Sequence, residues 1–284
     1  MAARWPNLFI VGAPKGGTTT LWRYLDQHPD IFMCPAKEPN FFLDPTPPVR
    51  VPTEDAYLRL FSGAGDERWL GEASGRYFSD PATPGLIEAT VPEARIVISL
   101  RDPVERAYSS YWHDVKFGIE TRPVAVVVDE QLDASELPVG ADPEKKHVYL
   151  GFYSQHVKRF LDRFGNAARV GFLEDLHADP TRESASIFDF LGVDPEVARQ
   201  ISPGAHNVFA QPRNRLAARL MASPTARAGG RAVFPEPLRT WVESLVLRRG
   251  QKPPLDDALR ERLQAAFEAD REPLERLLGR PVPW

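Results

Sequence analysis

The sequence predicts an α/β fold, a three-layer sandwich with a central, mostly parallel sheet and helices on both faces. Three observations support this fold class. Short runs that are apolar on both faces, as in 8–11 and 95–100, are typical of buried parallel strands. Stretches with helical spacing of apolar residues alternate with these runs. A glycine-containing loop joins the first strand directly to the first helix, as at the start of many α/β domains.

The N-terminal elements follow from apolar runs and from residues that break them. The strand over 8–11 leads through the loop 12–17 into a helix over about 18–27. A short strand is expected over 69–72. After the strand over 95–100, Asp102-Pro103 provides an N-cap and a proline at the first helical position, so we expect a helix to about Phe117.

The C-terminal elements are less regular. We expect helices over 150–164 and 181–191, a strand over 169–173, and one or two amphipathic helices over 255–278. Gly192 is a plausible C-cap. The stretches 118–147 and 222–256 are irregular, with an apolar patch at 124–128 and a candidate helix at 238–247. Because neither a repeat nor a linker interrupts the chain, a single domain is predicted over 1–284.

Composition narrows the class of protein. The chain has 284 residues, enough to bury a substantial core, and 28 prolines that are scattered as loop breakers. Lys+Arg 35 against Asp+Glu 39 gives a net charge of −4, which argues against a globally basic nucleic-acid binder. The single cysteine, Cys34, excludes an intrachain disulfide. The lack of a signal-peptide-like start or a long apolar run leads us to expect a cytoplasmic protein without a membrane span.

The loop Gly12–Gly17 has the residues of an anion site. Between a strand and a helix, such a loop directs backbone N–H groups and the positive helix end at a bound anion. The Walker A pattern almost fits from Gly12, but Thr18 stands where lysine is required, and the lysine is instead Lys15. We therefore predict a P-loop-like phosphate site. The alternative is a tight turn with a solvated Lys15.

Several motifs resemble those of sulfotransferases that use 3′-phosphoadenosine-5′-phosphosulfate (PAPS). Residues 14–21 (PKGGTTTL) resemble the family's 5′-phosphosulfate loop. Residues 37–42 (KEPNFF) are similar to the Lys-Glu-Pro-x-Phe-Phe element of heparan-sulfate-type and related bacterial members, which often have histidine where this chain has Asn40. Residues 99–111 resemble the 3′-phosphate-binding strand and helix. With weaker matches at 151–153 and 172–192, the resemblance covers about residues 7–192, whereas about 205–284 match only loosely.

This resemblance implies transfer of a sulfuryl group from PAPS to a hydroxyl or amine, leaving adenosine 3′,5′-bisphosphate (PAP) and requiring no metal. The residues that would bind the 5′-phosphosulfate are Lys15, Gly16, Gly17, Thr18, Thr19 and Thr20. Lys15 would also offset charge on the leaving oxygen. Arg101 and Ser109 would bind the 3′-phosphate. Further cofactor contacts are expected from Tyr153, Asn207 and Arg213, against the alternatives of a packed core tyrosine and an ordinary exposed loop. The alternative for Arg101 is an ion pair with Asp102, Glu105 or another acid.

The acceptor must lose a proton as it attacks sulfur, so a general base is needed. The resemblance of residues 37–39 to the family element makes Glu38 the candidate base, against the alternative of an exposed surface glutamate. His113, four residues beyond Ser109 on the same predicted helix, is the reserve. By analogy with the family, four residues are expected near the acceptor: Lys37, Glu72, Ser74 and Tyr77, with Glu72 as a candidate second acid/base group.

Two other functions stay open at this stage. An ATP- and magnesium-dependent P-loop kinase is disfavoured by the displaced lysine, and a non-catalytic nucleotide-binding protein by the joint presence of Lys15, Glu38, Arg101 and Ser109. Histidine and cysteine spacing does not suggest zinc, so no metal site is expected. The acceptor could be a small molecule, a lipid or a glycan, and the negative net charge mildly disfavours a long polyanion. The sequence does not predict the oligomeric state.

Overall fold

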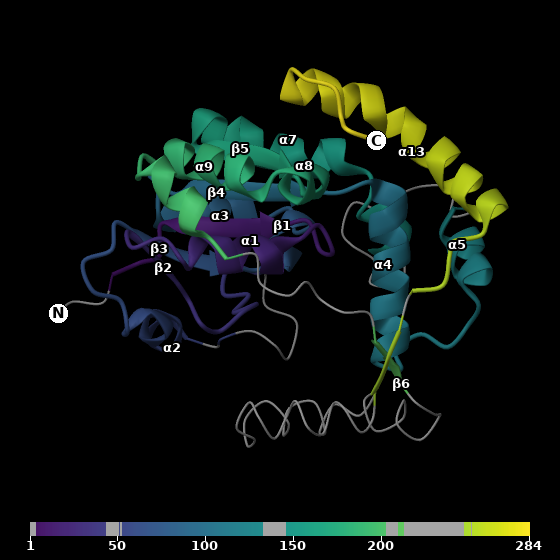
Figure 1. Ribbon diagram of the computed structural model, residues 1–284, viewed down its shortest axis with the longest axis horizontal. Coiled ribbons are helices and arrows are strands. Elements are labelled where there is room, and N and C mark those ends of the chain that lie inside the picture. Colours follow the sequence, from purple (N-terminus) through teal and green to yellow (C-terminus); the bar gives the residue numbers. More distant parts are fainter. Residues whose placement is uncertain are drawn as a thin grey trace.

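The computed structural model describes residues 4–43, 51, 53–132, 146–202, 210–212, 247–250 and 252–284. At its centre is a five-stranded sheet with the order β2-β3-β1-β4-β5 (Figure 1). All neighbouring strands in it are parallel. The strands are β1 (Leu8–Gly12), β2 (Ile31–Met33), β3 (Trp69–Ala73), β4 (Arg95–Leu100) and β5 (Ala168–Phe172). The predicted α/β fold class is confirmed.

Helices cover both faces of this sheet because its strands are apolar on both sides. Leu8 and Ile10 of β1 pack in one core cluster with α1 (Thr18–Leu25) and α9 (Pro180–Leu191). Phe9 and Val11, which point the opposite way, pack with α3 (Thr83–Thr90) and α7 (Tyr153–Phe164).

A third cluster lies beside the sheet, where α4 (Pro103–Lys116), α5 (Val124–Leu132) and α13 (Asp257–Leu278) meet (Figure 1). Tyr108 of α4 packs there with Leu263 and Phe267 of α13. The approach is close at Gly151, where an added Cβ would lie 2.5 Å from the Phe267 ring. The far end of α13 returns to the sheet, because Leu274 belongs to the core cluster of α7.

The remaining elements are short. They are α2 (Glu54–Leu58), η1 (Arg59–Phe61), η2 (Gly75–Phe78), α6 (Lys146–Tyr149), η4 (Gly165–Ala167), α8 (Leu173–Ala178), η5 (Pro195–Gln200) and the antiparallel pair β6 (Ala210–Pro212) and β7 (Leu247–Arg249). In the part of the chain that the structure describes, no helix is both long and apolar enough to cross a membrane.

Most predicted elements are present, with some differences. The helix expected from 150 begins at Tyr153, and the apolar patch at 124–128 is the start of α5. The C-terminal amphipathic stretch is one helix that contains Pro273. The strand β2 was not predicted. The candidate helix at 238–247 lies almost wholly outside the described residues, and the single domain over 1–284 stays a prediction.

The strand order brings two loops together. β1 and β4 are adjacent and parallel, and Gly12 at the end of β1 pairs with Ile98 near the end of β4. The segments that follow these strands, one with Lys15 and the other with Arg101, therefore leave the same edge of the sheet. Ligands of open α/β sheets bind at this carboxyl edge.

Candidate functional site

The glycine loop after β1 is fastened to β4 through Ser99. The Ala13 N–H donates to the Ser99 carbonyl at 2.8 Å, and the Ser99 hydroxyl donates to the Gly16 carbonyl at 2.6 Å. A Cβ on Gly16 would lie only 2.3 Å from the Ser99 carbonyl oxygen, so glycine is required there. Lys15 and Gly17 have φ values of 67° and 94°, and their left-handed backbone completes the turn.

The loop leads directly into the first turn of α1. Gly17 stands at the N-cap and brings no side chain to occupy the first N–H groups of the helix. Thr18 is buried, whereas Thr19 and Thr20 are half-buried. The Lys37 ammonium donates to the Thr19 hydroxyl at 2.7 Å, so the segment after β2 supplies a second cation to the same helix end. Such a helix end binds anions.

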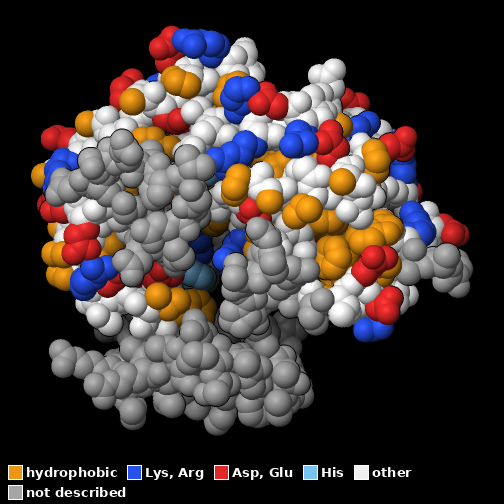
Figure 2. All heavy atoms as spheres, turned by 180° about the vertical axis from the view of Figure 1, so that it is seen from behind, with side chains coloured by type: hydrophobic (Ala, Val, Ile, Leu, Met, Phe, Trp, Pro, Cys, Tyr) orange, Lys and Arg blue, Asp and Glu red, His pale blue; other side chains and the backbone are white. Residues whose placement is uncertain are grey.

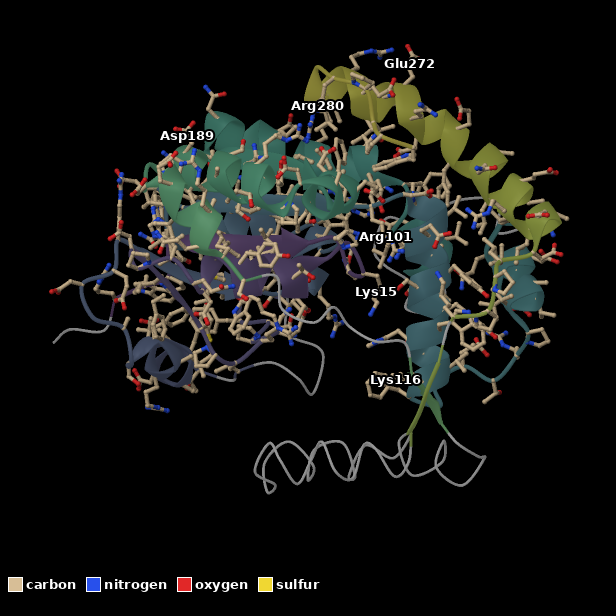
Figure 3. The ribbon with its side chains drawn as sticks, viewed as in Figure 1. Lys15, Arg101, Lys116, Asp189, Glu272 and Arg280 are labelled. Atoms are coloured by element: carbon tan, nitrogen blue, oxygen red, sulfur yellow. The ribbon has the colours of Figure 1, made fainter. Side chains whose placement is uncertain are left out.

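Positive charge gathers around Lys15. Its Nζ lies 3.3 Å from His113 Nδ1. Burial, followed by the charges of Lys116, Arg101 and Lys37, lowers the pKa of Lys15 to about 8, although Asp114 opposes this. In Figure 3, Lys15 and Arg101 lie between the sheet and α4, with Lys116 further along that helix. On the face seen in Figure 2, Lys or Arg side chains and a histidine lie close together.

One face of α4 lines the site. Ser109, His113 and Lys116 are four and three residues apart, the spacing that puts side chains on one face of a helix. Because His113 reaches Lys15, this face is turned toward the loop. Sequence reasoning found Ser109 and His113 but missed Lys116. Its helical spacing from Ser109 was the available signal.

Arg101 follows β4 and is held by its backbone. The Tyr153 hydroxyl donates to the Arg101 carbonyl at 2.7 Å, and the next N–H, that of Asp102, donates to Glu174 at 2.9 Å. Both polar groups of the peptide unit between Arg101 and Asp102 are thus hydrogen-bonded. The Arg101 guanidinium lies 3.6 Å from Glu105, so the ion pair considered from the sequence is present. Tyr153 is 1% exposed, which leaves it to position Arg101 rather than to touch a ligand as predicted.

Glu38 lies beside the glycine loop. Its carboxylate accepts the Gly75 N–H at 3.1 Å, and its own N–H donates to the Ala73 carbonyl at 3.0 Å. A Cβ built on Gly75 would lie 3.6 Å from Glu38 Oε1 and 3.7 Å from the Cα of Pro14, so both groups border the same glycine. Glu38 is half-buried. A carboxylate at this place is suited to accept a proton next to a bound anion.

Glu72, Ser74 and Tyr77, which were expected near the acceptor, are each 0% exposed. The Glu72 carboxylate accepts hydrogen bonds from Tyr57, Ser74 and Tyr77 at 2.6, 2.6 and 2.8 Å. Burial is the main cause that raises the pKa of Glu72 to about 7. An acceptor could not touch these side chains in this structure. One of the three donors, Tyr57, comes from the separate helix α2, and sequence patterns do not show that α2 packs here.

Two expected cofactor contacts, Asn207 and Arg213, lie outside the described residues. Among the residues that are described, no group of three or more His, Cys, Asp and Glu side chains could hold a metal ion.

The parallel sheet, the glycine loop at its carboxyl edge and the surrounding cations are typical of α/β proteins of the P-loop-like class. The sequence pattern of the Sulfotransferase domain family matches residues 6–268. The chain therefore belongs to this family, as the sequence motifs predicted.

Individual relatives agree with this assignment. The human bifunctional heparan sulfate N-deacetylase/N-sulfotransferase 2 is 30% identical over 205 residues, which are 68% of this chain and 22% of that protein. The human heparan sulfate glucosamine 3-O-sulfotransferase 3B1 is 29% identical over 191 residues, 66% of this chain and 46% of the relative. The chain thus spans less than half the length of each of these two relatives. The crystal structure of a sulfotransferase from Alicyclobacillus acidocaldarius superposes with a TM-score of 0.71 at 30% identity, covering 98% of both chains.

Proposed function

We propose that this protein is a PAPS-dependent sulfotransferase that moves the sulfuryl group to a hydroxyl or amine of a small-molecule, lipid or glycan acceptor. One observation carries the proposal. Lys37, Arg101 and Lys116 lie close enough to Lys15, in the loop after β1, that their charges, after burial as the main cause, lower its pKa. Like charges brought together in a folded protein repel one another, so a multiply charged anion is the ligand that this arrangement favours.

The residues fit the proposed donor. Lys15, Gly16, Gly17, Thr18, Thr19 and Thr20 would hold its 5′-phosphosulfate through the ammonium group, the hydroxyls and the first N–H groups of α1. Arg101 and Ser109 would hold the 3′-phosphate, and Arg101 would exchange part of its ion pair with Glu105 for that contact. Bound PAPS supplies the activated sulfuryl group and the leaving phosphate.

Two residues act directly in the proposed chemistry, one by stabilising charge and the other by taking a proton. Lys15 stabilises the negative charge that develops on the leaving oxygen as its bond to sulfur breaks. Glu38 takes the proton of the acceptor as the acceptor oxygen or nitrogen bonds to sulfur. His113 suits the base role less well. An ammonium group can only donate, so the contact with Lys15 requires that His113 Nδ1 accept from it.

A cytoplasmic location is part of the same proposal.

The direct test uses the purified full chain and PAPS labelled in its sulfuryl group, with a panel of phenol, sugar, amine and lipid acceptors in the presence of EDTA. Label should appear in at least one acceptor, and PAP should bind without magnesium. Binding of ATP only with magnesium, together with phosphoryl transfer, would instead indicate a kinase. Tight PAP binding without transfer to any acceptor would favour a non-catalytic nucleotide-binding protein.

The base is tested by Glu38→Gln, which keeps the size of the side chain and removes its basicity. We expect turnover to fall by about 100-fold or more, with the Kd for PAP changed by less than about twofold. Lys15→Ala is the contrasting variant, since it should weaken PAP binding as well as turnover. Full activity of Glu38→Gln would rule out Glu38 and assign the base role to His113.

A further inference from the structure

A buried hydrogen-bond network lies beneath the segment that carries Glu38. At its centre is Glu72, the fourth residue of β3, with no exposed surface. The direction of each bond in the network is determined by chemistry. The Asn40 N–H donates to the Ser74 oxygen at 3.1 Å, and the Phe42 N–H donates to the Tyr77 oxygen at 3.2 Å. The Ser74 and Tyr77 hydroxyl hydrogens are then directed at the Glu72 carboxylate, as observed.

The network reaches the segment at its strained positions. Glu38 and Asn40 have φ values of 58° and 54°, a left-handed conformation that residues with side chains rarely adopt. The Asn40 side chain donates to the Glu38 carbonyl at 2.9 Å, which ties these two residues together. Asparagine adopts this conformation more readily than glutamate does, so Glu38 is the residue that the surrounding structure must hold. The Asn40 N–H is bonded to Ser74, and Ser74 is bonded to Glu72.

We propose that Glu72 is a positioning residue of this site, which acts through Ser74 and Asn40 to hold Glu38 in the left-handed conformation that sets its carboxylate beside the glycine loop. This inference rests on the proposed function only for the role of Glu38 as the base. The negative charge of Glu38 also contributes to the raised pKa of Glu72, after burial, which places the two carboxylates within electrostatic reach.

Two of the donors to Glu72 distinguish a positioning role of this residue from a purely structural one. Tyr57 donates to the same Glu72 oxygen as Tyr77, but it comes from α2 and its hydroxyl lies outside the path to Asn40. Tyr57→Phe therefore removes one buried hydrogen bond to Glu72 and leaves the path intact. Ser74→Ala also removes one hydrogen bond to Glu72, and it breaks the path. The two variants form a matched pair.

The experiment compares turnover, PAP affinity, thermal stability and backbone hydrogen exchange in Ser74→Ala, Glu72→Gln and Tyr57→Phe. In Ser74→Ala and Glu72→Gln we expect kcat to fall by about 10- to 100-fold, the cost of misplacing a reacting group, with the Kd for PAP changed by less than about twofold. Amide exchange should accelerate over residues 37–42 in these two variants. Tyr57→Phe should lower the melting temperature while kcat and exchange over 37–42 stay near the wild-type values.

Two results would overturn the proposal: a kcat in Ser74→Ala equal to that of the wild type, or equal losses of kcat in Ser74→Ala and Tyr57→Phe that follow the loss of stability. These outcomes differ from failure of the proposed function. If Glu38→Gln is inactive but Ser74→Ala is fully active, only the positioning role is wrong. If Glu38→Gln is fully active, or if no sulfuryl transfer is found, the exchange over 37–42 still decides whether Glu72 holds the segment, and unchanged exchange rejects that role.

Discussion

Lys15 combines burial with three cationic neighbours, and for this reason its charge is held weakly. Its pKa of about 8 means that the free protein loses the ammonium charge as the pH rises through this value. Anion binding should weaken in the same direction. We expect the Kd for PAP to rise about tenfold between pH 7 and pH 9, measured by calorimetry, since only the charged form of Lys15 binds well. Above pH 8, binding should also take up a proton, which titrations in two buffers would detect.

The control for this prediction is Lys15→Arg, in which the cation stays charged throughout the pH range. Its affinity for PAP can be lower, but it should not follow the same pH dependence. If the Kd for PAP rises equally with pH in both proteins, a group other than Lys15 controls the pH dependence of binding.

Single residues of the site differ in how well the sequence predicts them. Lys15 and Arg101 lie shortly after β1 and β4, two strands that the sequence predicts, so their positions at the sheet edge follow from chain order. Glu38 follows the unpredicted strand β2, and only the resemblance of residues 37–42 to a family element indicated it. The burial of Glu72 and of Tyr153 depends on partners that are distant in sequence, such as Tyr57 of α2, and no periodic pattern contains that information. Residues with local causes therefore lie at the sheet edge, where their proposed roles stay predictions, whereas Glu72 and Tyr153, which were expected to contact ligands, are buried by tertiary packing.

At the scale of elements, the loop between β1 and α1 depends on a close backbone contact with β4. Gly16→Ala would place a methyl group 2.3 Å from the Ser99 carbonyl, which is backbone and cannot rotate away. The loop would have to move, so we expect PAP affinity to fall by at least about tenfold, and the free energy of unfolding by about 1–3 kcal/mol. Gly63→Ala is the control, since its methyl group would meet only the Phe32 ring at 3.6 Å. Equal effects of the two substitutions would contradict the role of this contact.

The same distinction between local and tertiary causes holds for whole elements. The helix α4 begins at Pro103 behind the Asp102 cap, as predicted, because capping is a local interaction. The strand β2 has only three residues, Ile31–Met33, too few to show a period. The start of α5 is rich in valine, which favours strands, yet it is helical where Val127 and Val128 pack into the cluster of α4 and α13. Packing across the molecule overrides the local preference there.

At the scale of the whole molecule, Glu105 joins the site to the C-terminal part of the chain. Its carboxylate lies 2.8 Å from Arg260 of α13, 3.0 Å from Lys252 and 3.6 Å from Arg101. Although burial raises it, the hydrogen bonds from Arg260 and Lys252 hold the pKa of Glu105 below its usual value. One carboxylate therefore both anchors α13 to α4 and offsets charge next to the proposed 3′-phosphate contact.

These two roles predict opposite effects for Glu105→Gln. At pH 7 the free energy of unfolding should fall by about 1–2 kcal/mol, because charge-assisted hydrogen bonds between α4 and the C-terminal segment are lost. The affinity for PAP should rise about three- to tenfold, because a negative charge leaves the anion site. Since the pKa of Glu105 is lowered in the folded state, its stabilisation is full above the unfolded pKa of about 4.3 and disappears as the pH falls through the folded value.

Urea unfolding at several pH values would measure this effect. Glu130→Gln is the control, because this carboxylate is exposed and its ion pair within the described residues is with the exposed Arg122. The free energies of unfolding of wild type and Glu105→Gln should become equal at low pH. Glu130→Gln should change the free energy of unfolding by less than about 0.5 kcal/mol at any pH. If Glu105→Gln weakens PAP binding, the carboxylate is needed to orient Arg101 and Lys252 more than its charge opposes the anion. Stability and affinity would then fall together, and the C-terminal segment would act as part of the site.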